Sequence, residues 1–248
     1  YPVQYEGEES SKNVFYTGAA PNQQAIPAVD YYLEELGVKK FALLGTDYVY
    51  PRTTNKILEQ YLKDKGISAS DIFVNYTPFG HSDWSKIVSD VVALGADGKK
   101  VGVISTINGD ANIGFYKELA AANISADKIP VVAFSVGEEE LSGLDTSNLV
   151  GHLAAWNYFQ SAESDINSEF IKAWKARMGN KRVTNDPMEA HYIGFNMWVN
   201  AVKQAGTTNV DAVRTAMYGQ KFPNLTGGTA EMLTNHHLSK PVLIGEIK

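Results

Sequence analysis

The sequence predicts an α/β protein built on a doubly wound parallel sheet, and two observations lead to this fold class. Helix-like and strand-like segments alternate over residues 25–155, as in proteins whose parallel strands are joined by helices. The strand-like segments are continuously apolar, for example FALLG at 41–45, as expected for a sheet that is covered on both faces. Together these two patterns predict helices on both sides of one buried sheet.

The elements are predicted in chain order from periodicity and from stop signals. Apolar residues recur at helical spacing over 26–36, and Gly37 provides a C-terminal stop. After residue 155 the pattern becomes mostly helical, with one last strand expected at 241–247. The other expected strands cover 41–45, 72–76, 101–106, 131–134 and 150–155, and the other expected helices cover 53–65, 83–94, 111–122, 138–141, 164–178, 187–204 and 210–218.

Composition excludes several functional classes. The chain has 248 residues, of which 44% are apolar, and it contains no apolar stretch long enough to span a bilayer. Its formal charge is -6 and it has no basic cluster, so we expect no nucleic-acid partner. The absence of cysteine excludes thiol nucleophiles, thiolate metal sites and disulfides. No metal, cofactor or nucleophile motif is recognisable, and we expect neither a cofactor nor a catalytic site.

Candidate binding residues follow the predicted strands. Ligands bind beyond the carboxyl ends of the strands in open parallel sheets, so side chains there are expected to converge. The combination of aromatic and small polar groups suits a small, neutral, hydrogen-bonding ligand held between rings. The candidates at these positions are Tyr48, Tyr50, Asn108, Asp110, Ser135, Glu138 and Trp156.

Each candidate also has a structural interpretation. Tyr48 and Tyr50 are two residues apart, so an extended backbone would turn both rings to one side, but aromatic packing at a loop is the alternative. Asp110 could accept two N–H bonds from a ligand or could cap the following helix. Glu138 fits the first turn of a helix, where the dipole favours a carboxylate, and Trp156 fits packing at a hinge.

Several stretches resemble the urea-binding proteins of bacterial urea ABC transporters, which are type I periplasmic binding proteins. The most characteristic stretches are YPVQYEG, GTDYVYPRTTN, STINGDANIGFYKEL, FSVGEEEL, AAWNYFQS and TNHHLSKPVLIGEIK. The resemblance implies two doubly wound lobes that are joined by a hinge and close over one ligand. It begins about a third of the way into a typical member, so the first lobe is expected to be incomplete.

The resemblance also implies a division into lobes. Residues 1–22 and 156–238 would form the first lobe, and residues 23–155 and 241–248 the second. The chain has neither an initiator Met nor a signal-type start, so we expect it to be cut from a longer protein, with any signal peptide upstream.

The family implies roles for individual residues. In the amide-sensing relatives a DY-x-YP run supplies rings to the ligand, which carries over to Tyr48 and Tyr50. Tyr1, and less strongly Gln4, carry over from the segment that precedes YEG. Those relatives lack an acidic residue at the position of Asp110, which favours urea over acetamide-like ligands.

The function expected from the resemblance is that of a non-enzymatic receptor. It would capture urea or a related short amide outside the cytoplasm, in the periplasm or at the cell surface with or without a lipid anchor, and deliver it to a membrane ABC permease. The receptor itself would not insert into the membrane. An amide-sensing regulator, a branched-chain amino-acid receptor and an amide hydrolase are the alternatives.

Overall fold

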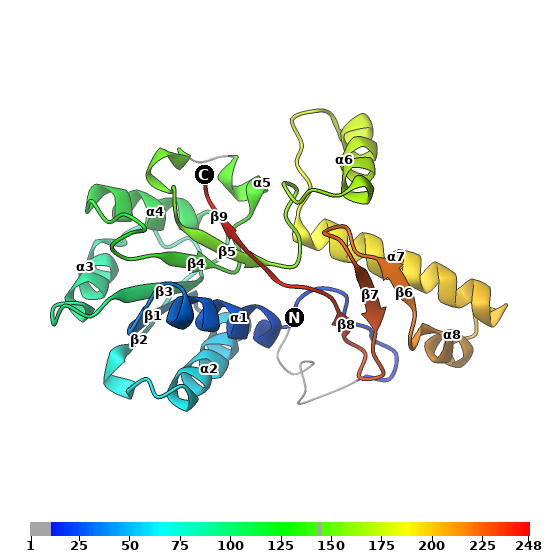
Figure 1. Ribbon diagram of the computed structural model, residues 1–248, viewed down its shortest axis with the longest axis horizontal. Coiled ribbons are helices and arrows are strands. Elements are labelled where there is room, and N and C mark those ends of the chain that lie inside the picture. Colours follow the sequence, from blue (N-terminus) through cyan, green and yellow to red (C-terminus); the bar gives the residue numbers. More distant parts are fainter. Residues whose placement is uncertain (1–10, 143–144) are drawn as a thin grey trace.

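The chain folds into two bodies that lie side by side. The structure is a computed structural model and describes residues 11–142 and 145–248. One body contains a six-stranded sheet with helices on both faces, and the other contains three helices and a small antiparallel sheet (Figure 1). None of the described helices combines the length and the apolar character needed to cross a membrane.

The large sheet is parallel except at one edge. Its strand order is β2-β1-β3-β4-β5-β9, and β9 runs antiparallel to β5. Because β1 lies between β2 and β3, the connections leave it in opposite directions, and a crevice opens at the carboxyl ends of β1 and β3. The strands are β1 (Lys40–Thr46), β2 (Ile72–Thr77), β3 (Val101–Thr106), β4 (Val131–Ala133), β5 (Leu153–Trp156) and β9 (Leu243–Glu246).

Helices cover both faces of this sheet and form two separate apolar cores. α1 (Pro21–Glu34) and α2 (Val49–Asp64) pack on one face, while α3 (Ser85–Leu94) and α4 (Ala111–Ala121) pack on the other. The short α5 (Glu138–Leu141) follows β4. Two 3-10 turns cover Ala69–Asp71 and Thr146–Asn148. The predicted doubly wound α/β architecture is therefore confirmed.

The second body is built around the long helix α7. Its apolar face packs on α8 and on the small sheet, and it forms a third core with them. The N-terminus of α7 is fixed by Asn185, whose side-chain oxygen accepts the backbone N–H of Met188. The elements are α6 (Asp165–Met178), α7 (Asp186–Ala205), α8 (Val210–Met217), β6 (Lys221–Pro223), β7 (Thr229–Met232) and β8 (Leu238–Ser239).

Two expected element boundaries are wrong, and one small sheet was not expected. α2 begins at Val49 rather than at 53, so the backbone after Tyr48 is helical and not extended. β5 begins at Leu153 rather than at 150, because Gly151 has a φ of 89° and forms a turn there. The sheet β6–β7–β8 was not expected, since strands of two to four residues are too short to show an alternating pattern.

Three segments connect the two bodies. They lie before α1, after β5 and before β9, and the last of these is visible in Figure 1 as the chain leading into the red strand. Tyr16, just before the first crossing, exchanges backbone hydrogen bonds with the segment around β8, which anchors that crossing to the second body. The division into lobes at the residues given above stays a prediction.

Candidate functional site

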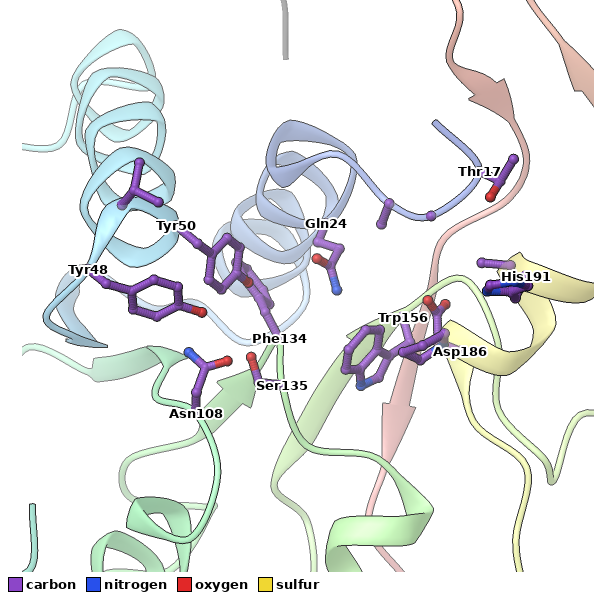
Figure 2. Close-up of a pocket in the computed structure, with 15 residues that line it drawn as sticks. Thr17, Gln24, Tyr48, Tyr50, Asn108, Phe134, Ser135, Trp156, Asp186 and His191 are labelled. Atoms are coloured by element: carbon purple, nitrogen blue, oxygen red, sulfur yellow. The ribbon is translucent and has the colours of Figure 1, made fainter. Parts of the chain in front are cut away.

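A cavity of about 640 Å³ lies between the two bodies, at the carboxyl ends of β1 and β3. This is the crevice that the strand order creates. Figure 2 shows the tyrosines on one side of it and Trp156, Asp186 and His191 on the other. The cavity is lined by Thr17, Gly18, Ala19, Gln24, Tyr48, Val49, Tyr50, Asn108, Phe134, Ser135, Trp156, Asp186, Pro187, Ala190 and His191.

Tyr48 and Tyr50 both line the cavity, although the backbone after Tyr48 is helical and not extended as expected. Tyr48 is the N-cap of α2 and Tyr50 lies in its first turn, with the two ring centroids 6.1 Å apart. The Tyr48 ring also contacts Phe79 at 5.0 Å, and partial burial raises the pKa of the Tyr48 hydroxyl. The hydroxyl therefore stays protonated at neutral pH.

Asn108 lies on the floor of the cavity, where the backbone leaves β3. Its backbone N–H donates to Thr46 Oγ1 at 2.9 Å, and its Nδ2 donates to the Thr106 carbonyl at 2.9 Å. Both bonds tie the residue to the carboxyl ends of β1 and β3. Figure 2 shows the amide oxygen turned toward Ser135, so Asn108 can offer an acceptor to a ligand.

Trp156 and Gln24 form a wall near the crossings between the bodies. The indole Nε1 of Trp156 donates to the Val136 carbonyl at 2.9 Å, which fixes the ring against the turn after β4. The buried Gln24 donates from Nε2 to the Ala155 carbonyl at 2.7 Å. Because each donor is engaged by the protein, Trp156 presents its ring face and Gln24 its amide oxygen as available features.

Asp186 is a cavity residue that sequence reasoning missed. It is only 5% exposed, it stands in the first turn of α7, and its Oδ2 accepts the backbone N–H of Asn157 at 2.8 Å. Burial raises the pKa of this carboxyl, while Lys240 and two backbone N–H groups oppose the increase. The signal in the sequence was the run Asn185-Asp186-Pro187, which reads as an ordinary helix start and so attracted no functional interpretation.

Two of the predicted site residues, Asp110 and Glu138, do not line the cavity. Asp110 is exposed, makes no side-chain cap bond at the start of α4 and does not line the cavity. Glu138 lines a different hollow, and its Oε1 accepts from the backbone N–H and the hydroxyl of Ser161. Tyr1 and Gln4 lie outside the described residues.

The cavity carries an asymmetric set of charges. Among its described lining residues Asp186 is the one carboxylate, and none is Lys or Arg. Oxygen acceptors from Asp186, Asn108 and Gln24 face a space walled by Tyr48, Tyr50 and Trp156. The arrangement can therefore bind a ligand rich in N–H donors between aromatic faces.

Two bodies with a cavity at their junction form the kind of architecture in which proteins hold a small ligand between lobes. The family profile described as periplasmic binding protein domain matches residues 1–248, and the chain belongs to this family. Its fold is the type I fold of these proteins, α/β with a mostly parallel sheet.

Solved structures of ABC transporter binding proteins share the fold. An ABC transporter substrate-binding protein from Sphaerobacter thermophilus is 19% identical with a TM-score of 0.85, covering 99% of this chain and 66% of that chain. A solute-binding protein of an ABC transporter from Rhodopseudomonas palustris, in complex with p-hydroxybenzoic acid, is 17% identical with a TM-score of 0.81, covering 100% of this chain and 70% of that chain.

A curated relative matches part of the chain. The limonene hydroxylase of Geobacillus stearothermophilus is 31% identical over 96 residues, which is 39% of this chain and 18% of that protein. The present chain thus spans less than a fifth of this relative and about two thirds of the Sphaerobacter protein.

Proposed function

We propose that the chain is the ligand-binding part of an extracytoplasmic solute-binding protein, which captures urea or a closely related short amide and delivers it to an ABC permease. The family match and the ABC transporter binding proteins among the similar structures support the receptor role. The ligand class is supported by one observation in particular, the buried carboxylate of Asp186 in a cavity lined by no Lys or Arg among the described residues.

Charge argues against a carboxylate ligand such as a benzoate. An anion in this cavity would lie near Asp186 with no Lys or Arg among the described lining residues to pair with it, and burying like charges together is costly. Urea has the opposite requirement. It carries four N–H donors and one carbonyl acceptor, so three oxygen acceptors from Asp186, Asn108 and Gln24 match its excess of donors.

The aromatic side chains supply the apolar part of the site. Urea and short amides are planar, and the rings of Tyr48, Tyr50 and Trp156 offer faces on which such a plane can lie. A volume of 640 Å³ is much larger than one urea molecule, so tight binding requires the walls to approach each other around the ligand. Contacts to both bodies would then favour the closed arrangement over the open one.

A second candidate is an amino-acid receptor, which the carboxylate of Asp186 and the volume of the cavity also favour. A carboxylate pairs with an α-ammonium group, and the volume of the cavity admits a side chain the size of leucine. Such a ligand also brings a carboxylate of its own, which needs donors that the described lining offers mainly through hydroxyls. A ligand panel separates this candidate from a urea receptor.

The test is thermal unfolding of the protein with urea, acetamide, formamide, leucine and p-hydroxybenzoate. A ligand present at 100 times its Kd should stabilise a one-site receptor by about 2.7 kcal/mol. Urea should be kept near 10 mM, where its denaturing effect is only about 0.03 kcal/mol at most. We expect the midpoint to rise most with urea or a short amide and not to rise with p-hydroxybenzoate.

Two aspartate variants make the test specific. Asp186→Asn removes the buried acceptor charge and should weaken urea binding by about 10- to 100-fold, the value of a hydrogen bond to a charged group. Asp110→Asn makes the same chemical change at an exposed residue outside the cavity and should leave the affinity unchanged. Unchanged binding in Asp186→Asn would remove Asp186 from the binding site, and a loss of affinity in Asp110→Asn would return the carboxylate role to Asp110. A midpoint that rises most with leucine would favour the amino-acid receptor.

A further inference from the structure

Behind the cavity wall, three charged side chains form a buried cluster. Asp186 and Glu189 are three residues apart on α7, and Lys240 comes from the crossing that leads into β9. Lys240 Nζ contacts Glu189 Oε2, and the two side chains are 2% and 0% exposed. Lysine and glutamate are almost never buried to this extent unless they are paired. The chain therefore places a complete ion pair between the hinge and the ligand-binding carboxylate.

The cluster has one negative charge too many. Asp186 and Glu189 are neighbours on one face of α7, Glu189 is paired with the single ammonium of Lys240, and of the two carboxylates Asp186 alone borders the cavity. Burial raises the pKa of both carboxyl groups; the ammonium of Lys240 opposes this for both, and the neighbouring Asp186 raises the pKa of Glu189 further. Whether Asp186 is charged therefore depends on the balance between Lys240 and Glu189.

The groups that face Asp186 from the other packed elements are few. From the segment after β5 come the backbone N–H groups of Asn157 and Tyr158, which stabilise its charged form. The Tyr158 hydroxyl bonds instead to Thr184 and Asn167, and burial raises its pKa to about 12, so it adds no charge at neutral pH. On α7 itself, the exposed His191 lines the cavity together with Asp186.

We infer that Lys240 and Glu189 are positioning residues that set the charge of Asp186 from behind the cavity, and so set the pH range over which the protein binds a ligand with N–H donors. The inference rests on the proposed function for the ligand class, and on the geometry of the buried cluster for the charge coupling. Lys240 holds Asp186 in the anionic, hydrogen-bond-accepting form. Glu189 opposes this effect of Lys240, because its own carboxylate is paired with the Lys240 ammonium. The same ion pair connects the hinge segment to the first turn of α7.

The two residues should act in opposite directions. Glu189→Gln keeps the shape of the side chain but removes a negative neighbour, so Asp186 should lose its charge at a lower pH. Lys240→Met removes the positive neighbour, so Asp186 should lose its charge at a higher pH. A charge about 4–6 Å from a carboxyl group shifts its titration by about 1 unit or more. A purely structural role would weaken binding at every pH and would not move the titration in opposite directions.

The experiment follows Asp186 itself, without a ligand. The side-chain carboxyl carbon signal of Asp186 is recorded by NMR from pH 4 to pH 8 and is assigned by its disappearance in Asp186→Asn. We expect its midpoint to fall by about 1 pH unit in Glu189→Gln and to rise in Lys240→Met. Lys248→Met, the same substitution at an exposed position just after β9, should leave it unchanged. If Lys240→Met does not fold, Glu189→Gln provides the test alone. In that variant Lys240 still has Asp186 as a charged partner.

Calorimetric titration of urea over the same pH range then connects the cluster to binding. At a pH midway between the midpoints of the parent and of Glu189→Gln, the variant should bind urea about threefold more tightly. An Asp186 midpoint that does not move in Glu189→Gln, or moves upward, overturns the inference whatever the protein binds. A midpoint that moves as expected in a protein that binds no urea supports the charge coupling and removes the proposed ligand class instead.

Discussion

His152 lies just before β5 with its imidazole completely buried. Its Nδ1 accepts the backbone N–H of Val131 at 3.1 Å, so the neutral ring carries its proton on Nε2. Burial lowers the pKa of His152 to about 4, whereas an unfolded histidine titrates near 6.5. The folded state therefore resists protonation, and stability that is present above pH 6.5 should be lost as the pH falls toward 4.

This coupling predicts a loss of about 3 kcal/mol in the free energy of unfolding between pH 6.5 and pH 4 from this one residue. His152→Asn can keep an acceptor near the Val131 N–H but cannot titrate, so its stability should fall by about 3 kcal/mol less over the same range. The measurement is guanidinium unfolding at several pH values, because urea is the proposed ligand. Equal pH dependence in the parent and in His152→Asn would contradict the assignment.

At the scale of elements, the start of α2 is held by a close approach that only glycine permits. A Cβ at Gly45 would lie 2.6 Å from Pro51 Cβ and 2.6 Å from Thr106 Oγ1. Pro51 follows Tyr50 in the first turn of α2, and Thr106 ends β3 beside Asn108. The packing at Gly45 thus brings the aromatic wall and the floor of the cavity together.

Gly45→Ala should therefore lower stability by about 1–3 kcal/mol and also weaken urea binding, because the first turn of α2 must move. Gly102→Ala is the matched control. Its Cβ would meet the Tyr32 ring at 2.6 Å, on the face of the sheet that packs against α1 and away from the cavity. We expect a similar loss of stability with unchanged affinity, measured by guanidinium unfolding and calorimetry. An equal loss of affinity in both variants would mean that the effect is global.

Sequence patterns predicted the large elements because those patterns are local. The apolar strands and the helical periodicity around Phe41 and Val103 are visible within a few residues, and the strand ends led to Tyr48, Tyr50 and Asn108. Asp186 could not be found in this way, because it is 78 residues after Asn108 and meets it only through the packing of two bodies. Asp110 is predicted because it follows a strand and could accept two N–H bonds, but as the N-cap residue of α4 it is exposed.

At the scale of the whole molecule, the two bodies meet through more than the three chain crossings. Glu139 at the start of α5 accepts from Arg182 and from Asn185 of the second body at 3.3 and 3.0 Å. Asn185 is also the N-cap of α7 and precedes Asp186. The acidic run 138–140 thus contributes contacts between bodies, and the position of the Asp186 wall depends on how the bodies are held.

A ligand that touches both walls should therefore protect both bodies at once. Amide hydrogen exchange with and without urea, at about 100 times its Kd, should slow at residues 106–110 beyond β3 and at residues 186–190 in the first turn of α7. The two segments belong to different elements, and neither supplies hydrogen-bond partners to the other. Joint protection of both segments therefore requires a bridging ligand. In Asp186→Asn the protection of α7 should be lost together with the affinity. Protection confined to residues 106–110 would mean that the ligand binds one body alone, and closure about it would then have no driving force.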